Sequence, residues 1–129
     1  MGVKAFLGLV FAKYIVVKNN AWKKNALQFQ HKTMLQLINS AKNTSFGKDH
    51  NFAKIKTYAD FTRLIPVRDY EGLRPYIEQI VQGKEGVLWP KKPIYFCKTS
   101  GTTSGTKYIP ITKESMPNHI IAARDSILC

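Results

Sequence analysis

One loop of this chain combines the residue types that bind phosphate groups. It consists of hydroxyl-bearing side chains, two glycines and a closing lysine, in the order Thr99, Ser100, Gly101, Thr102, Thr103, Ser104, Gly105, Thr106 and Lys107. Glycines allow backbone N–H groups to approach an anion closely and to adopt positive φ angles. Ser and Thr hydroxyls donate hydrogen bonds without adding charge, and a lysine ammonium adds a compact positive charge. The composition therefore predicts a site for the β- and γ-phosphates of a nucleotide.

The spacing of this loop differs from two common nucleotide-binding patterns. A Walker loop that began at Gly101 would need glycine at position 106 and Ser or Thr after the lysine, whereas the chain has Thr106 and Tyr108 there. The separation of Gly101 from Gly105 also excludes the GxGxxG pattern. A surface linker rich in Ser, Thr and Gly is the alternative. We favour the phosphate site, because a linker seldom follows a buried strand and ends on a lysine.

The segments on either side of the loop are predicted to be short strands. Ile94–Cys97 is an apolar run of residues that favour β-structure, and Tyr108–Ile111 is a second extended run. Loops that leave the carboxyl ends of strands are where open α/β sheets bind ligands. Thr112 is placed to cap a last helix, whose apolar pattern continues to Cys129 without a stop signal. We therefore expect the chain to be part of a longer domain.

The residues before the loop are predicted to be mainly helical. Apolar residues recur at steps of three and four over residues 3–17, and Asn19 and Asn20 are expected to end this first helix. Its apolar stripe could lie on a membrane surface, but docking on a protein core is the favoured interpretation. A second helix is expected over residues 27–41, and the turn-rich residues 43–47 end it.

Capping residues predict two further helices. Thr57, with Asp60 three residues later, is a capping-box-like start for a short helix that Pro66 ends. Asp69 is the N-cap of the next helix, and Gly83 supplies its stop.

Four residues near these helices could be mistaken for parts of a site. Tyr70, Tyr76 and Trp89 could form a wall for a substrate, but core packing is the favoured interpretation. His50 lies in a polar turn, and we interpret it as a solvated loop residue rather than a ligand.

Composition favours a protein that handles anionic substrates. The net charge is +12, from 20 Lys and Arg against 8 Asp and Glu, which could also indicate a polyanionic partner. The lysines are scattered rather than gathered on one face, so we expect no nucleic-acid partner. The two cysteines and three histidines match no metal-binding spacing, and no metal site is expected among them. Lys13 interrupts the apolar run at the N-terminus, so neither a signal peptide nor a stable membrane insertion is expected. Two cysteines do not make a disulfide framework, so we expect a reduced thiol pair and a cytoplasmic location.

The loop resembles the phosphate-loop signature of the adenylate-forming superfamily. In that superfamily the sequence T-S-G-T-T is followed by G-x-P-K, and Thr99–Thr103 is followed here by Ser104–Lys107, with the lysine in register and the proline missing. Upstream segments resemble one branch, the auxin-responsive-promoter (Gretchen Hagen three) family of acyl acid–amido synthetases. The segments that carry this resemblance are Asn43–Lys48, Pro66–Glu71, Leu73–Ile77 and Lys107–Pro110, and the likeness extends from about residue 30 to the C-terminus.

The resemblance implies an α/β fold in which residues 1–129 are the N-terminal part of one large adenylate-forming domain. Residues 1–92 would be a mainly helical lead-in, and residues 93–129 would form a strand, the phosphate loop, a second strand and a helix. The rest of this domain, the C-terminal domain, the acyl pocket and the catalytic residues are expected beyond Cys129.

The resemblance also implies a reaction in two steps. ATP and a carboxylic acid would give an acyl-adenylate, and an amine such as an amino acid would then displace AMP. The ATP phosphates, with Mg²⁺, would be held by Thr99, Ser100, Gly101, Thr102, Thr103, Ser104, Gly105 and Lys107. Two alternatives stay open: an adenylating enzyme that transfers the acyl group to coenzyme A, and a non-catalytic basic binding module.

Overall fold

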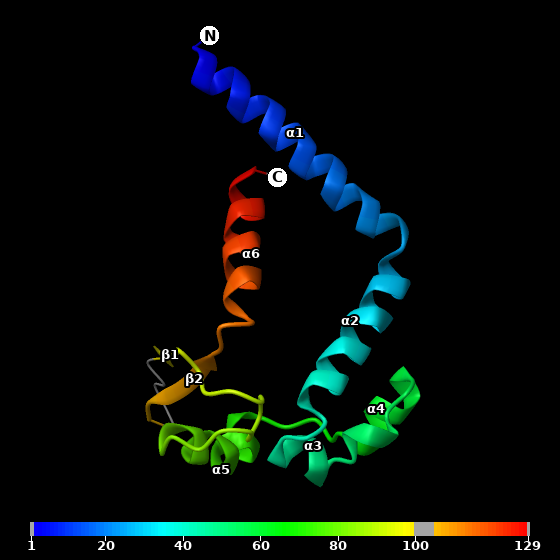
Figure 1. The fold of residues 1–129 in the computed structure, drawn as a ribbon, viewed down its shortest axis with the longest axis vertical. Helices are drawn as coiled ribbons and strands as arrows, with labels where there is room; N and C mark the ends of the chain where they lie inside the picture. The colour runs from blue at the N-terminus through cyan, green and yellow to red at the C-terminus, as the bar shows by residue number, and fades with distance from the viewer. Residues whose placement is uncertain (1, 100–104, 129) are drawn as a thin grey trace.

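The computed structural model of the chain describes residues 2–99 and 105–128. Two long helices, α1 (Val3–Lys24) and α2 (Ala26–Ala41), lead into a group of short helices, and the β1–β2 hairpin lies over α5 (Figure 1). The last helix, α6 (Met116–Leu128), runs from the hairpin back toward α1 (Figure 1). Helices combined with a small sheet are compatible with the predicted α/β class.

Helix α1 is longer than the sequence predicts. The expectation that Asn19 and Asn20 end it is wrong, because the helix continues to Lys24. Asn19 donates a hydrogen bond to Asp125 of α6, with its Nδ2 2.9 Å from Oδ2. An asparagine that is engaged in this way does not compete for its own backbone, which is how Asn usually disrupts a helix.

The apolar stripe of α1 is largely exposed. Ile15 is 2 % exposed, and α1 contacts α6 and α2. Ile15 is not part of the predicted stripe. The stripe residues themselves face solvent in the described chain, so the predicted docking of the stripe is not seen: Val3, Phe6, Leu7, Val10, Phe11, Tyr14 and Val17. Among the described residues, no helix has the length and apolar character needed to cross a membrane.

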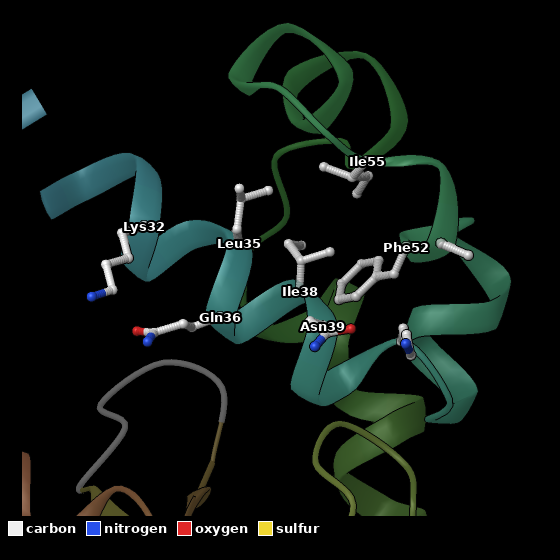
Figure 2. Close-up of a pocket in the computed structure, with 9 residues that line it drawn as sticks. Lys32, Leu35, Gln36, Ile38, Asn39, Phe52 and Ile55 are labelled. Carbon is white, nitrogen blue, oxygen red and sulfur yellow. The ribbon is translucent and has the colours of Figure 1, made fainter. Parts of the chain in front are cut away.

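The main core lies where α2 meets the residues that follow it. Ile38 and Ala41 of α2 pack with Phe52 and Ile55, and Trp89 packs against this cluster, as predicted. A cavity of about 520 Å³ opens beside the core, between α2 and η1 (Phe52–Lys54). Figure 2 shows Ile38 and Phe52 pointing toward one another, whereas Lys32 points away.

The turn after α2 is built around Thr44, which is 1 % exposed. Its hydroxyl donates to the carbonyl of Ala41 at 2.7 Å and accepts the N–H of Gly47 at 3.0 Å, which caps α3 (Ser45–Asp49). A side chain at Gly47 would overlap the backbone oxygen of Ala41. The predicted end of α2 is therefore confirmed, and glycine is required by close approach of the backbone.

Both predicted caps are confirmed. Helix α4 (Tyr58–Leu64) begins with a complete capping box, in which Thr57 and Asp60 each bond the backbone N–H of the other. Donation from the Thr57 hydroxyl and from the backbone of Lys56 and Thr57 lowers the pKa of Asp60. Helix α5 (Tyr70–Val81) begins at Asp69, whose carboxylate accepts the N–H of Gly72 at 2.9 Å.

Helix α5 ends in a left-handed glycine, as predicted. Gly83 has a φ of 91° and donates its N–H to Ile80, while Lys84 donates to Gln79. These two bonds form a Schellman motif, which satisfies the last carbonyl groups of the helix.

The two predicted strands form an antiparallel hairpin. Strands β1 (Tyr95–Thr99) and β2 (Lys107–Ile111) pair from Tyr95↔Ile111 to Thr99↔Lys107. Every residue of β1 is exposed, so the expectation that a buried strand precedes the loop is wrong.

The last helix begins later than Thr112 predicts. Thr112 and Ser115 exchange hydrogen bonds in a turn, and α6 starts after that turn at Met116. Thr112 therefore stabilises the turn that precedes α6 and is not the N-cap of the helix. Pro117 occupies the first turn, where its missing N–H costs no helical hydrogen bond.

Candidate functional site

The predicted phosphate loop connects the two strands of the hairpin. Thr99 is the last residue of β1, and Lys107, directly opposite it, is the first residue of β2. Gly105 precedes β2 with a φ of 77°, in the left-handed region that glycine adopts readily. The other predicted site residues lie outside the described residues: Ser100, Gly101, Thr102, Thr103 and Ser104.

The pairing places a hydroxyl and an ammonium group on the same face of the hairpin. Side chains of directly paired residues share a face, so those of Thr99 and Lys107 project to one side at the loop end. The neighbouring pair, Lys98 and Tyr108, projects to the other side. Lys98 Nζ lies 5.8 Å from the centre of the Tyr108 ring. Both faces of the hairpin therefore carry a cation near the loop.

The Lys107 ammonium is supported by an aromatic ring and not by a carboxylate. Its Nζ lies 5.5 Å from the centre of the Tyr70 ring. Over the described ranges, no Asp or Glu oxygen comes within ion-pair distance of this nitrogen. A cation over a tyrosine ring gains about 0.5–1 kcal/mol at an exposed site. The positive charge of Lys107 is thus oriented but not neutralised.

Tyr70 also bonds the backbone of β2. Its hydroxyl accepts the N–H of Tyr108 at 2.8 Å and lies 3.5 Å from the carbonyl oxygen of the same residue. The prediction that Tyr70 serves core packing therefore missed its contact with the hairpin. No local pattern could have revealed it, because Tyr70 and Tyr108 are 38 residues apart.

A second cation approaches the same ring, but this one is paired. The guanidinium carbon of Arg74 lies 5.8 Å from the centre of the Tyr70 ring. Arg74 Nη2 donates a hydrogen bond to Glu71 Oε1 at 2.8 Å, and its Nε lies 2.7 Å from Oε2 as an ion pair. The hydrogen bond and the charge of Glu71 raise the pKa of Arg74. Glu71 therefore takes up the charge of Arg74 rather than that of Lys107.

The segment before Tyr70 is fixed by a buried histidine. The interpretation of His50 as a solvated residue is wrong, because it is 7 % exposed and its ring stacks on Phe46. Its Nε2 lies 2.9 Å from Arg68 Nη2, and its Nδ1 lies 2.9 Å from the carbonyl oxygen of Phe46. A guanidinium group only donates, so Nε2 accepts and Nδ1 carries the hydrogen. His50 ties α3 to the residue two positions before Tyr70.

Tyr76 serves packing, as predicted. Its ring meets Phe46 edge to face with centroids 5.1 Å apart, and its hydroxyl donates to Asp49 Oδ2 at 2.7 Å. Donation to that carboxylate raises the pKa of Tyr76. The segments Asn43–Lys48, Pro66–Glu71 and Leu73–Ile77, which carry the family resemblance, therefore join α3 to α5. Helix α5 in turn contacts β2.

The described donors suit an anion better than a bare cation. Thr99 supplies a hydroxyl, and Lys98 and Lys107 supply ammonium groups that form no ion pair with an Asp or Glu of the described residues. Within residues 2–99 and 105–128, no group of three or more His, Cys, Asp and Glu residues could hold a metal ion. A divalent cation would therefore need oxygen ligands from elsewhere, and phosphate groups supply such oxygens.

Comparisons with known proteins agree with this arrangement at the level of the family. The model for the GH3 family N-terminal domain matches residues 18–127. The chain is 42% identical over 60 residues to a probable indole-3-acetic acid-amido synthetase, GH3.13, of Oryza sativa subsp. japonica. It is 40% identical over 57 residues to the indole-3-acetic acid-amido synthetase GH3.10 of Arabidopsis thaliana, and 38% over 63 residues to GH3.15 of the same plant.

These alignments cover a small part of each relative. They include 45%, 43% and 47% of this chain, but only 13%, 10% and 11% of the three relatives in the same order. The family match, in contrast, extends over most of the chain. This chain therefore belongs to the GH3 family, and residues 18–127 correspond to its N-terminal domain.

Proposed function

We propose that the protein containing this chain is an ATP-dependent ligase that joins a carboxylic acid to an amine such as an amino acid. The observation that carries the proposal is the Thr99–Lys107 pair at the end of a loop rich in Ser, Thr and Gly. The pair presents a hydroxyl and an ammonium group that forms no ion pair with a carboxylate of the described residues. Membership of the GH3 family and the names of the amido synthetase relatives support the ligase class.

The proposed reaction has two steps. A carboxylate oxygen of the acid attacks the α-phosphorus of ATP, and pyrophosphate leaves to give an acyl-adenylate. The amine nitrogen then attacks the acyl carbon, AMP leaves with the bonding electrons, and the amine loses a proton. Both steps expel a good leaving group, so the protein contributes positioning and electrostatic stabilisation rather than covalent catalysis.

In this proposal the loop holds the β- and γ-phosphates. Lys107 contributes a charge-assisted contact, and Thr99 contributes a hydroxyl from the same face of the hairpin. Gly105 allows the chain to turn into β2 with a positive φ. The family resemblance assigns phosphate contacts to residues 100–104 as well. Mg²⁺, bound with the nucleotide, would share the negative charge of the phosphates.

An exchange assay on the full-length protein tests the proposal. With a panel of carboxylic acids, an adenylating enzyme moves radioactive pyrophosphate into ATP only when an acid that it accepts is present. We expect exchange with at least one acid. A protein that folds but shows no acid-dependent exchange would contradict the proposal and favour a binding module.

The acceptor is tested separately. We expect mass spectrometry to detect an amide when the same acid is incubated with ATP and a mixture of amino acids. A thioester formed with coenzyme A, and no amide, would assign the protein to another branch of adenylating enzymes.

A further inference from the structure

We propose that Tyr70 is a positioning residue for the nucleotide phosphates: it fixes the β2 end of the loop and the direction of the Lys107 ammonium group. The inference rests on the proposed function, because it concerns the residue that holds the phosphate loop in place. It assigns a role in ATP affinity to a residue of α5, outside the loop and its strands.

The first part of the argument is the outer edge of β2. In an antiparallel pair, backbone groups of successive residues point alternately toward the partner strand and away from it. Tyr108 donates its N–H to Tyr70 and so faces away from β1. Pro110 shares this orientation by alternation but has no N–H to donate. Within β2, Tyr108 is therefore the outward-facing donor, and the Tyr70 hydroxyl satisfies it one residue from Lys107.

The second part is the Tyr70 ring. A lysine side chain has four rotatable bonds and loses up to about 2 kcal/mol of rotamer entropy when it is fixed. The Tyr70 ring already holds the Lys107 ammonium at 5.5 Å from its centre, without neutralising its charge. Part of the ordering cost is thus met before a phosphate arrives, which is how preorganisation raises affinity.

The third part is that Tyr70 itself is anchored. Asp69 caps the helix that begins at Tyr70. Arg68 contacts the buried His50 through Nη2 and lies within 3.3 Å of the Gly72 carbonyl oxygen through Nη1. Three consecutive residues therefore tie α3, α5 and β2 together. The ring and the hydroxyl act from a rigid support, which a positioning residue requires.

Tyr76 provides a matched control. It lies on the same helix, is half-buried like Tyr70, and also uses its hydroxyl in one short hydrogen bond, to Asp49. Tyr70→Phe and Tyr76→Phe each remove one hydroxyl from α5. Only Tyr70→Phe removes a hydrogen bond to the hairpin.

The test uses the full-length protein and compares Tyr70→Phe, Tyr70→Leu, Tyr76→Phe and Lys107→Ala. The KM for ATP, the KM for the acid and kcat are measured by pyrophosphate exchange, together with the melting temperature. We expect Tyr70→Phe to raise the KM for ATP about three- to tenfold, the range of one net hydrogen bond. Tyr70→Leu, which also removes the ring, should raise it further, and Tyr76→Phe should leave it within about twofold of wild type. The KM for the acid should stay constant in all of these variants.

A double variant guards against a merely structural effect. If Tyr70 acts through Lys107, Tyr70→Leu should change the KM for ATP less in the Lys107→Ala background than in wild type. Two results would overturn the inference, provided that Lys107→Ala still impairs ATP use. One is that the effects of Tyr70→Leu and Lys107→Ala on the KM for ATP are fully additive, and the other is that Tyr70→Phe and Tyr76→Phe have equal KM values for ATP. An unchanged KM and kcat in Lys107→Ala would instead overturn the proposed role of the loop.

Discussion

Thr99 and Lys107 form the last cross-strand pair of the hairpin, so the hydroxyl of one and the ammonium group of the other leave the same face at the base of the loop. Gly105 lies two residues before Lys107 and has a positive φ. We therefore expect the backbone at Gly105 to influence the direction of the Lys107 side chain. Substitutions in the turn therefore test the site without removing a contacting side chain.

Gly105 is the first position for such a test. Its φ is 77°, and no atom of the described residues lies within 4 Å of the place that a Cβ would occupy, so backbone strain is the expected cost of a substitution there. We expect Gly105→Ala to cost about 1 kcal/mol or more and to raise the KM for ATP. Gly105→Asn should be milder, because asparagine tolerates the left-handed region. Equal effects of the two substitutions would contradict the strain argument.

His50 gives a prediction about stability. His50→Ala would remove a buried ring that stacks on Phe46 and accepts a hydrogen bond from Arg68, and one net hydrogen bond contributes about 0.5–1.5 kcal/mol. We therefore expect a clear fall in the melting temperature. His31→Ala is a suitable control, because His31 is exposed on α2. An unchanged melting temperature for His50→Ala would show that the contact with Arg68 contributes little.

The capping box of α4 predicts a dependence of stability on pH. The folded state lowers the pKa of Asp60, chiefly through the hydroxyl of Thr57, so the folded state favours the ionised carboxylate. This contribution is present above the ordinary aspartate pKa of about 3.9 and is lost as pH falls through the lower folded value. Asp60→Asn should therefore reduce stability at pH 7, and its deficit should shrink as the pH falls below about 4. A deficit independent of pH would contradict this assignment.

The elements that sequence reasoning predicted correctly are those with signals confined to a few neighbouring residues. The caps at Thr57 and Asp69 and the left-handed Gly83 depend on hydrogen bonds that span three to five residues. The two strands that flank the loop follow from apolar runs of β-favouring residues. Such local preferences act before tertiary structure is specified.

The errors arise where a distant partner decides the outcome. Asn19 stays helical because Asp125, 106 residues away, binds its side chain. His50 is buried against Arg68, 18 residues away, and Tyr70 reaches Tyr108, 38 residues away. By themselves Asn19 and His50 favour a turn or the surface, and Tyr70 favours core packing, but a tertiary hydrogen bond engages each of them. The position of the loop between two strands could be predicted from the sequence, whereas the contact of Tyr70 with the second strand could not.

The central claim is that the loop from Thr99 to Lys107 binds the phosphates of ATP. Gly101→Val would place a branched side chain where the resemblance puts backbone against phosphate, and Lys107→Ala would remove one charge-assisted contact worth about 1.5–3 kcal/mol. Lys113→Ala removes the same charge from an exposed residue after β2 and serves as the control.

The most direct measurement is the rate of acid-dependent pyrophosphate release by the full-length protein and these three variants. The account predicts that Lys107→Ala lowers the rate roughly ten- to a hundredfold, that Gly101→Val lowers it more, and that Lys113→Ala leaves it unchanged. Melting temperatures should barely differ. Wild-type rates in both Lys107→Ala and Gly101→Val would show that the loop is a linker and would contradict the account.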